Sequence, residues 1–347
     1  MENRLQTILD CISEADSLNL YFITRKEKEN LVGRRRALDK YDFSTLRVDI
    51  NEDVSGYLRN LVQEQIQHAI NKRLEMLPYE VIADDQEQIF TYSELNKVGS
   101  FAKVINEQLP SRTAIQTMQD FNDLSNQGLI WAYCVELSYI DDSTRKYMYT
   151  FRKLNAGNIV VDENDNNPRL TKNLMALFNT QSNKLEKFKG GAIKLDASID
   201  CVFYSNIFYI LQKSQFETMV GLAEDFQEQA LSVVRELNQL DKIVGLEHIT
   251  AEIGKNTAIH KKLVRLQKLH NYGTLDNSMI TKMKKAAKAE DYKLKIDANG
   301  KILIENTKDV DMVIKLLCDY YKQGVVTGKN YGTYAGKYFD NAESAGK

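Results

Sequence analysis

The stretch LIWAYCVELSYIDDSTRKYMYTFRKL, residues 129–154, decides the fold of this chain. Two runs rich in β-branched and aromatic residues flank the polar sequence DDST, as two antiparallel strands flank a turn. Further along, IDCVFYSNIFYIL at 199–211 is divided by Ser205-Asn206, a two-residue turn that tolerates positive φ. Both stretches predict β-hairpins.

Helical spacing dominates the segments around these hairpins. Residues 55–77 carry apolar side chains on one helical face, and 96–109, 113–128 and 172–181 look similarly helical. Residues 215–240 predict one long helix with a wide apolar face that covers the sheet. A last helix is expected over 311–326 with Gly324 as its C-terminal cap, followed by an irregular, glycine-rich tail.

These patterns predict an α/β, or α+β, protein with an extensive core, since 43% of its 347 residues are hydrophobic. A mixed, helix-rich region is expected over 1–125. A C-terminal mixed domain with β-hairpins, a long helix and a basic helix-helix-hairpin region is expected over 126–340, and a tail over 341–347.

Composition excludes several classes of site. Four widely separated cysteines predict reduced thiols rather than a zinc knuckle or a disulfide framework. Without a signal-like start or an apolar run of about 20 residues, the chain is expected to be cytoplasmic. No phosphate-binding loop, metal-binding histidine pair or nucleophile elbow occurs. No cofactor, metal site or catalytic residue is therefore predicted, and enzymatic activity is left open.

Charge is concentrated in one region, although the whole chain carries a formal charge of only -2. Residues 255–295 contain eleven Lys or Arg and three acidic residues, a net of +8, so the remainder sums to -10. The sequence predicts an electrically polarised molecule. The arginine cluster Arg34–Arg36 is interpreted as a solvated surface turn.

Two helices and a hairpin are predicted within this basic region. A helix over 258–270 places Ile259, Leu263 and Leu266 on one side, with its basic residues roughly opposite and facing water. A second helix, over 279–290, is capped by Asn277 or Ser278. A hairpin over 292–306 turns at Asn299-Gly300. This order is similar to a helix-turn-helix followed by a wing.

Such a surface is suited to the phosphates of DNA, which attract Lys and Arg regardless of base sequence. The residues predicted to contact the DNA backbone are Lys261, Arg265, Lys268, Lys282, Lys285, Lys288, Lys293 and Lys295. Three alternatives stay open: lysines that only solvate two helices, a scaffold that binds an acidic protein or membrane headgroups, and a metal-dependent nuclease. The nuclease would use Asp196 and Asp200, with Glu186 nearby.

The second half also resembles a known family. YMYTFRKL, the second hairpin with the helix after it, and NGKILIENTKDVDMVIKLLCDYYKQGVVTGKNY are similar to the B component of the bacterial Kiwa anti-phage defence system, over roughly 130–340. The resemblance is carried by Ile199-Asp200, Phe208-Tyr209-Ile210, Phe216-Glu217, Leu317, Asp319, Thr327-Gly328, Tyr331 and Lys337. It implies a cytosolic, dimer-forming effector that binds DNA and works with a multi-spanning membrane component, the A subunit. It implies no established catalytic centre.

Overall fold

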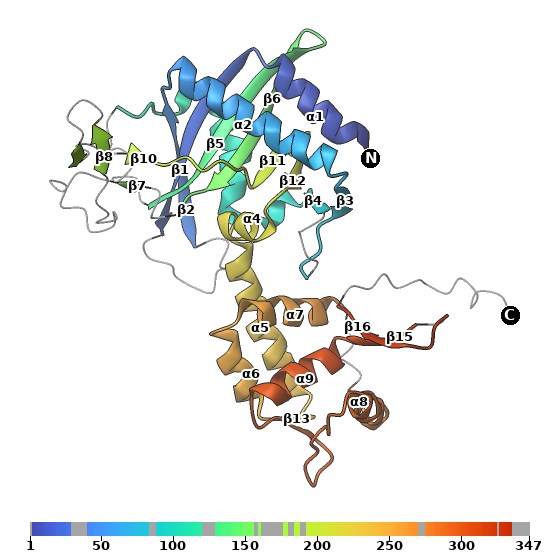
Figure 1. Ribbon diagram of the computed structural model, residues 1–347. Coiled ribbons are helices and arrows are strands. Elements are labelled where there is room, and N and C mark those ends of the chain that lie inside the picture. The colour runs from blue at the N-terminus through green and yellow to red at the C-terminus, as the bar shows by residue number, and fades with distance from the viewer. Residues whose placement is uncertain are drawn as a thin grey trace. The chain divides into compact units, whose positions relative to one another are not determined.

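The computed structural model describes residues 2–28, 40–82, 88–119, 129–155, 159–160, 176–179, 184–187, 192–269, 275–324 and 326–334. The chain forms two compact units (Figure 1). The first, here the sheet unit, comprises residues 1–79 and 85–222; the second, the helical unit, comprises 80–84 and 223–347. The units do not divide at residue 125, because strands on both sides of that residue pair in one sheet.

The described part of the sheet unit contains an eight-stranded sheet in the order β2-β1-β5-β6-β11-β12-β4-β3. Its neighbouring strands are antiparallel except for β3 and β4. The strands are β1 (Ser17–Glu27), β2 (Tyr41–Val48), β3 (Glu75–Pro78), β4 (Gln88–Tyr92), β5 (Leu129–Asp141), β6 (Thr144–Lys153), β11 (Cys201–Tyr204) and β12 (Ile207–Ile210). The sheet together with its helices confirms the α/β class.

Both predicted hairpins are confirmed. β5 and β6 pair from Ala132–Lys153 to Asp141–Thr144, and the turn between them has positive φ at Asp142 and Ser143. β11 and β12 turn at Ser205 and Asn206, whose φ values are 50° and 61°. Short polar residues tolerate this left-handed backbone, which matches the twist of paired strands.

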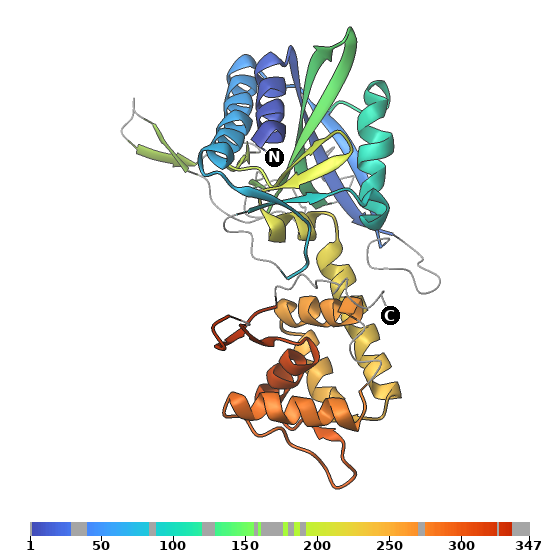
Figure 2. The ribbon, with the colours of Figure 1, turned by 90° about the vertical axis from the view of Figure 1, so that its right-hand side faces the viewer.

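Helical layers cover both faces of the sheet. Helices α1 (Glu2–Glu14) and α2 (Glu52–Asn71) lie on one face, over a core that includes Ile8, Leu58 and Val135 (Figure 1). The opposite face is covered by the short helices η2 (Leu95–Lys97), η3 (Gly99–Phe101), η4 (Val104–Gln108) and η5 (Leu109–Ala114), drawn in blue-green in Figure 2. Alternation along the strands explains the two layers, since successive side chains point to opposite faces.

Two of the expected helices in the sheet unit are wrong where the structure describes them. Residues 115–119 are not helical: Thr117 forms a parallel bridge with Arg47 at the edge of β2, and 120–128 lie outside the described residues. Within 172–181, residues 176–179 form a strand. This strand, β8 (Ala176–Asn179), pairs with β9 (Lys184–Lys187) in a two-stranded ribbon. A second two-stranded ribbon consists of β7 (Ile159–Val160) and β10 (Ala192–Ile193).

The single long helix expected over 215–240 is also wrong. It is divided into α4 (Lys213–Met219) and α5 (Leu222–Gln239) at Gly221, whose φ of 84° lies in the left-handed region. α4 packs against β6 in the sheet unit, whereas α5 from Ala223 onward belongs to the helical unit. The glycine therefore ends one helix and separates the parts that the two units use.

The helical unit packs its elements around a separate core that includes Leu237, Leu263, Met283 and Val313. Its elements after α5 are β13 (Ile243–Val244), α6 (Leu246–Ile253), α7 (Thr257–Leu269), α8 (Asn277–Ala289), β14 (Ile302–Leu303), α9 (Thr307–Leu317), β15 (Tyr321–Gln323) and β16 (Asn330–Gly332). β13 and β14 pair in parallel, and β15 and β16 pair antiparallel.

The C-terminal helix ends earlier than predicted. α9 stops at Leu317 because Asp319 takes a positive φ, and the chain enters β15, so Gly324 caps no helix. The irregular tail is wrong for residues 330–332, which form β16. A Cβ at Gly332 would lie 2.3 Å from the Tyr320 ring, so this position favours glycine. Lys337 and 341–347 lie outside the described residues.

Candidate nucleic-acid interface

The basic side of α7 does not face water as predicted. Arg265 is buried, with its guanidinium Nη1 3.5 Å from Glu80 Oε1 in the same unit. The expectation that it is exposed is wrong because Val264 and His260 are buried as well, so α7 is covered on more than the face of its apolar stripe. Lys261 is only half-buried, while the side chain of Lys268 lies outside the described residues.

Lys262 on the same helix is compensated inside its own unit. Its Nζ lies 3.0 Å from Asp311 Oδ1 and 5.1 Å from the centre of the Tyr334 ring. A cation held by a carboxylate and an aromatic face stabilises the packing of α7 against its neighbours. α7 therefore contributes less free charge than its sequence suggests.

α8 is amphipathic in the way that the sequence predicts. Its N-cap is Asp276, one residue before the expected cap, and the Met279 N–H donates to its carboxylate at 2.8 Å. Ile280, Met283 and Ala287 are buried along one stripe. The other sides of the helix carry exposed lysines: Lys282, Lys284, Lys285 and Lys288.

These four lysines and Lys293 form no ion pair with the carboxylates of the part of the chain that the structure describes. The nearest acidic residues in sequence after α8, Glu290 and Asp291, are themselves exposed. On a helix, side chains three or four residues apart are neighbours, so the lysines of α8 repel one another. This cationic edge, defined as Lys282, Lys284, Lys285, Lys288 and Lys293, is unusual because nothing described within the fold compensates it.

The predicted hairpin after α8 is reduced to a single bridge. Ile296 and Ile302 form an isolated antiparallel bridge around a turn in which Gly300 has a φ of 82°. Ile302 and Leu303 also pair with Ile243 and Val244 of β13, so this short stretch has neighbours on both of its edges. The Lys-rich arm of the hairpin is thus a mostly irregular segment beside α8.

Lys295 on this segment differs from the cationic edge. Its Nζ lies 2.7 Å from Glu305 Oε2 and 2.9 Å from Asp309 Oδ2. Hydrogen bonds to Glu305 and to Asp309 raise the pKa of Lys295 above its ordinary value. The prediction that Lys295 is a free surface cation is wrong, since two carboxylates neutralise it.

An open groove of about 890 Å³ lies between α8 and the segment that follows it. Its lining combines a cationic rim with an apolar surface. The lining residues are Lys284, Lys288, Asp291, Tyr292, Lys293, Leu294, Lys295, Ile296 and Leu303. Sequence analysis predicted the lysines of this region but not the groove, which depends on how 291–303 folds back.

The carboxylates considered for a nuclease are engaged by an arginine. Arg152 donates to Asp200 at 2.5 Å and to Asp196 at 3.1 Å, and Asp200 also accepts the Lys153 N–H. Burial raises the pKa of Asp200, while the Lys153 N–H and Arg152 oppose that shift. No group of three metal-ligating side chains occurs among the described residues. An arginine placed between both carboxylates does not suit a divalent cation.

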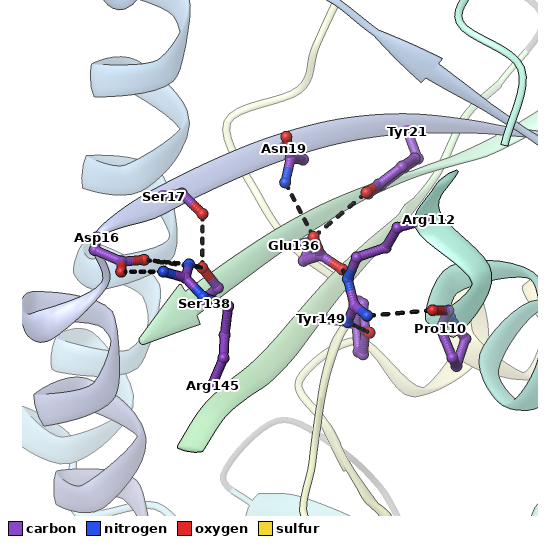
Figure 3. A network of polar contacts seen from close by, with 10 residues as sticks. All are labelled: Asp16, Ser17, Asn19, Tyr21, Pro110, Arg112, Glu136, Ser138, Arg145 and Tyr149. Carbon is purple, nitrogen blue, oxygen red and sulfur yellow. Dashed lines mark hydrogen bonds and ion pairs between the residues drawn. The ribbon is translucent and has the colours of Figure 1, made fainter. Parts of the chain in front are cut away.

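A second buried carboxylate, Glu136 on β5, was missed by sequence analysis. It is 1% exposed and lies 3.0 Å from Arg112 Nε, while Asn19 and Tyr21 donate to its other oxygen (Figure 3). Arg112 also donates to the Tyr149 hydroxyl. The signal was a single acidic residue within an apolar strand. The network fastens η5 to the sheet, and Glu136 at its centre is shielded from solvent.

The comparisons with known proteins identify the family. The family model for the Kiwa protein KwaB-like family matches residues 127–327, more than half of the chain. The chain belongs to the Kiwa KwaB-like family. It is thereby assigned to a component of Kiwa anti-phage defence, and the matched range includes α8 and the groove. Neither the curated proteins nor the solved structures contain a match. Among the described helices, none has the length and apolarity to cross a membrane.

Proposed function

We propose that this Kiwa-family chain binds DNA without reading its base sequence, and that the cationic edge of α8 supplies the contacts. The observation that carries the proposal is a run of exposed lysines with no carboxylate partner among the described residues, Lys282, Lys284, Lys285, Lys288 and Lys293. Each ammonium group that meets a phosphate releases condensed counterions, which favours binding at low salt.

Repulsion within α8 supports the same conclusion. Lys284 and Lys288 are four residues apart, and Lys282 and Lys285 are three apart, so like charges lie next to one another on the helix surface. Such pairs destabilise a helix by a few tenths of a kcal/mol each, at low salt. A polyanion removes this repulsion when it binds. The helix is therefore better suited to the complex than to the free protein.

The proposed contacts are phosphate contacts, since lysine ammonium groups act as point charges and contact the DNA backbone without fixing a base sequence. Of the residues predicted from the sequence, Lys282, Lys285, Lys288 and Lys293 keep this role, and Lys284 joins them. Lys261 and Lys268 stay predicted contacts on α7. Arg265 and Lys295 are assigned to the folding of the unit instead, because carboxylates pair with both.

The family membership supports two further parts of the proposal. The chain forms a homodimer or a higher homo-oligomer, and it acts in the cytoplasm at the inner membrane through the multi-spanning A component of the Kiwa system. Co-purification of this chain with that component from detergent-solubilised membranes tests the partnership, and sedimentation of the isolated chain tests the dimer. A monomer that never co-purifies with the membrane component overturns both.

Charge reversal on α8 tests DNA binding. The variant carries Lys282→Glu, Lys285→Glu and Lys288→Glu, and its control carries Lys72→Glu, Lys103→Glu and Lys146→Glu, three exposed lysines of the sheet unit. Both variants change the net charge equally. In a mobility shift at low salt, the α8 variant should lose at least about tenfold in affinity and the control should not.

The mobility shift, a vesicle-binding assay and a plasmid-cleavage assay together separate the alternatives. Equal affinity of the two variants for DNA removes α8 as the interface. Loss of binding to anionic vesicles, with unchanged binding to DNA, favours the scaffold that grips headgroups. Magnesium-dependent cleavage of plasmid that Asp200→Asn abolishes favours the nuclease, and intact plasmid excludes it.

A further inference from the structure

We infer that the groove beside α8 takes the unstacked bases of single-stranded DNA, so that the form of DNA bound is a single strand rather than a duplex. The inference rests on the proposed DNA binding and names the ligand of that same surface. It starts from the groove lining, in which apolar side chains and uncompensated lysines occur together.

The groove has two chemically different parts. Tyr292, Leu294, Ile296 and Leu303 form an apolar surface, and of these Tyr292, Ile296 and Leu303 are only partly covered by the protein. Lys284, Lys288 and Lys293 are exposed along its rim. Asp291 lies on the rim as well, and the charge of Lys295 is already compensated by Glu305 and Asp309. A matching ligand has an apolar, flat part and a chain of negative charges.

The two forms of DNA differ in whether they can fill such a groove. A duplex keeps its bases stacked inside and presents phosphate and sugar, so it can meet the lysines but leaves the apolar surface uncovered. A single strand can turn its bases outward onto apolar and aromatic side chains while a basic groove follows its backbone. Only the single strand satisfies both parts of the lining.

Tyr292 is preorganised as the stacking platform. Its hydroxyl donates to Asp309 Oδ1, and Asp309 is 2% exposed and also accepts from Lys295, the Glu305 N–H and Asn306. Its backbone N–H donates to the Ala287 carbonyl at the end of α8. The ring is thus anchored at both ends while it remains part of the groove wall. A ring that is already fixed loses little conformational entropy when a base stacks on it.

The rim has a spacing suited to a backbone. Lys284 and Lys288 are one helical turn apart, which places their Cβ atoms about 5–6 Å from each other. They can therefore contact successive phosphates of an extended strand on the α8 side. Lys293 lines the groove from the segment that follows the turn at Glu290 and Asp291.

The experiment compares two ligands and two substitutions at one residue. Fluorescence anisotropy measures binding of an oligothymidylate, which forms no duplex, and of a mixed-sequence duplex of the same length, at one salt concentration. Wild type should bind the single strand more tightly. Tyr292→Leu should weaken single-strand binding about tenfold, with less than about a twofold change for the duplex. Tyr292→Phe keeps the ring and should retain most of the single-strand affinity, although it loses the bond to Asp309.

The outcomes distinguish this inference from the proposed function. Duplex binding that equals or exceeds single-strand binding overturns the inference and leaves DNA binding by α8 in place. No binding of either ligand overturns both. Wild-type protein gives an independent reading if Tyr292→Leu does not fold: photocrosslinking with an iodouracil-substituted single strand should label Tyr292, and labelling only outside the groove overturns the inference.

Discussion

The two units hold their basic side chains in opposite ways. In the sheet unit, Arg112 and Arg152 are directed at carboxylates that are almost completely buried, Glu136 and Asp200. In the helical unit, the lysines of the cationic edge lie on the exposed sides of α8 and just after it, and no carboxylate of the described residues pairs with them. A buried, paired cation holds the fold together, whereas an exposed, unpaired cation is available to a ligand. The difference separates structural charge from functional charge within one chain.

The largest expected effect comes from Arg152→Met. It leaves Asp200, which is 0% exposed, without the guanidinium that neutralises it. An uncompensated buried charge destabilises a protein by about 3–5 kcal/mol, so the urea midpoint of the sheet unit should fall strongly. The fluorescence of Trp131, the only tryptophan and a buried residue of β5, reports unfolding of this unit.

Lys288→Met is the matched control, since it also replaces a cation by methionine but leaves no buried carboxylate behind. If Arg152→Met unfolds at the same urea concentration as this control, the Asp200 pair contributes nothing to the fold. The contacts of Arg152 with Asp196 and Asp200 would then need an explanation other than stability, which would favour the nuclease alternative.

A smaller effect is expected at the two ion pairs of Figure 3. Arg112→Met removes one donor from buried Glu136, but Asn19 and Tyr21 still donate to it, so the loss should be about 2–3 kcal/mol. Arg145→Met breaks a pair with exposed Asp16 and should leave the urea midpoint near that of wild type. Equal losses for the two variants would show that burial of the carboxylate does not decide the effect.

Local patterns predicted the fold where local chemistry decides it. The hairpins at 129–154 and 199–211 follow from alternating residues and from turns that accept positive φ, and the exposed lysines of α8 follow from its apolar stripe. The break at Gly221 was missed because the apolar face continues in sequence across this glycine, whose left-handed φ ends the first helix. Residues 176–179 and 321–323 were expected to be helical but form strands. They pair with 184–187 and 330–332, and helical periodicity within one segment does not show such a pairing.

The candidate site could be predicted only as a set of lysines. Periodicity on one helix could not show that Arg265 is covered, because the side chains that cover it come from elsewhere in the unit. The pairing of Lys295 with Glu305 and Asp309 depends on the return of the chain after Gly300, and so does the groove. Charge is visible in a sequence, but compensation of charge is a property of the folded chain.

Wild type and Lys153→Met should differ in how their stability depends on pH. Burial, and next Arg25, lower the pKa of Lys153 from 10.5 to about 8. Between these values the unfolded chain keeps a proton on Lys153 that the folded chain has released, so rising pH stabilises the folded state. From about pH 7 to about pH 9.5, wild type should gain about 1–2 kcal/mol relative to Lys153→Met, measured by Trp131 fluorescence in urea. A difference that is constant with pH would contradict the lowered pKa.

Lys288→Met should have the smallest effect on stability. It also distinguishes most sharply between charge that stabilises the fold and charge that binds a ligand. Loss of repulsion with Lys284 and Lys285 stabilises α8, while loss of a cation in its last turn destabilises it. These effects nearly cancel, so unfolding measured by circular dichroism should change by less than about 0.5 kcal/mol. Binding should respond instead: one phosphate contact fewer lowers the slope of log affinity against log salt by about one. If the slope and the stability are both unchanged, Lys288 is a solvated surface lysine that contacts no phosphate. The premise that the uncompensated charge of α8 binds a polyanion would then fail.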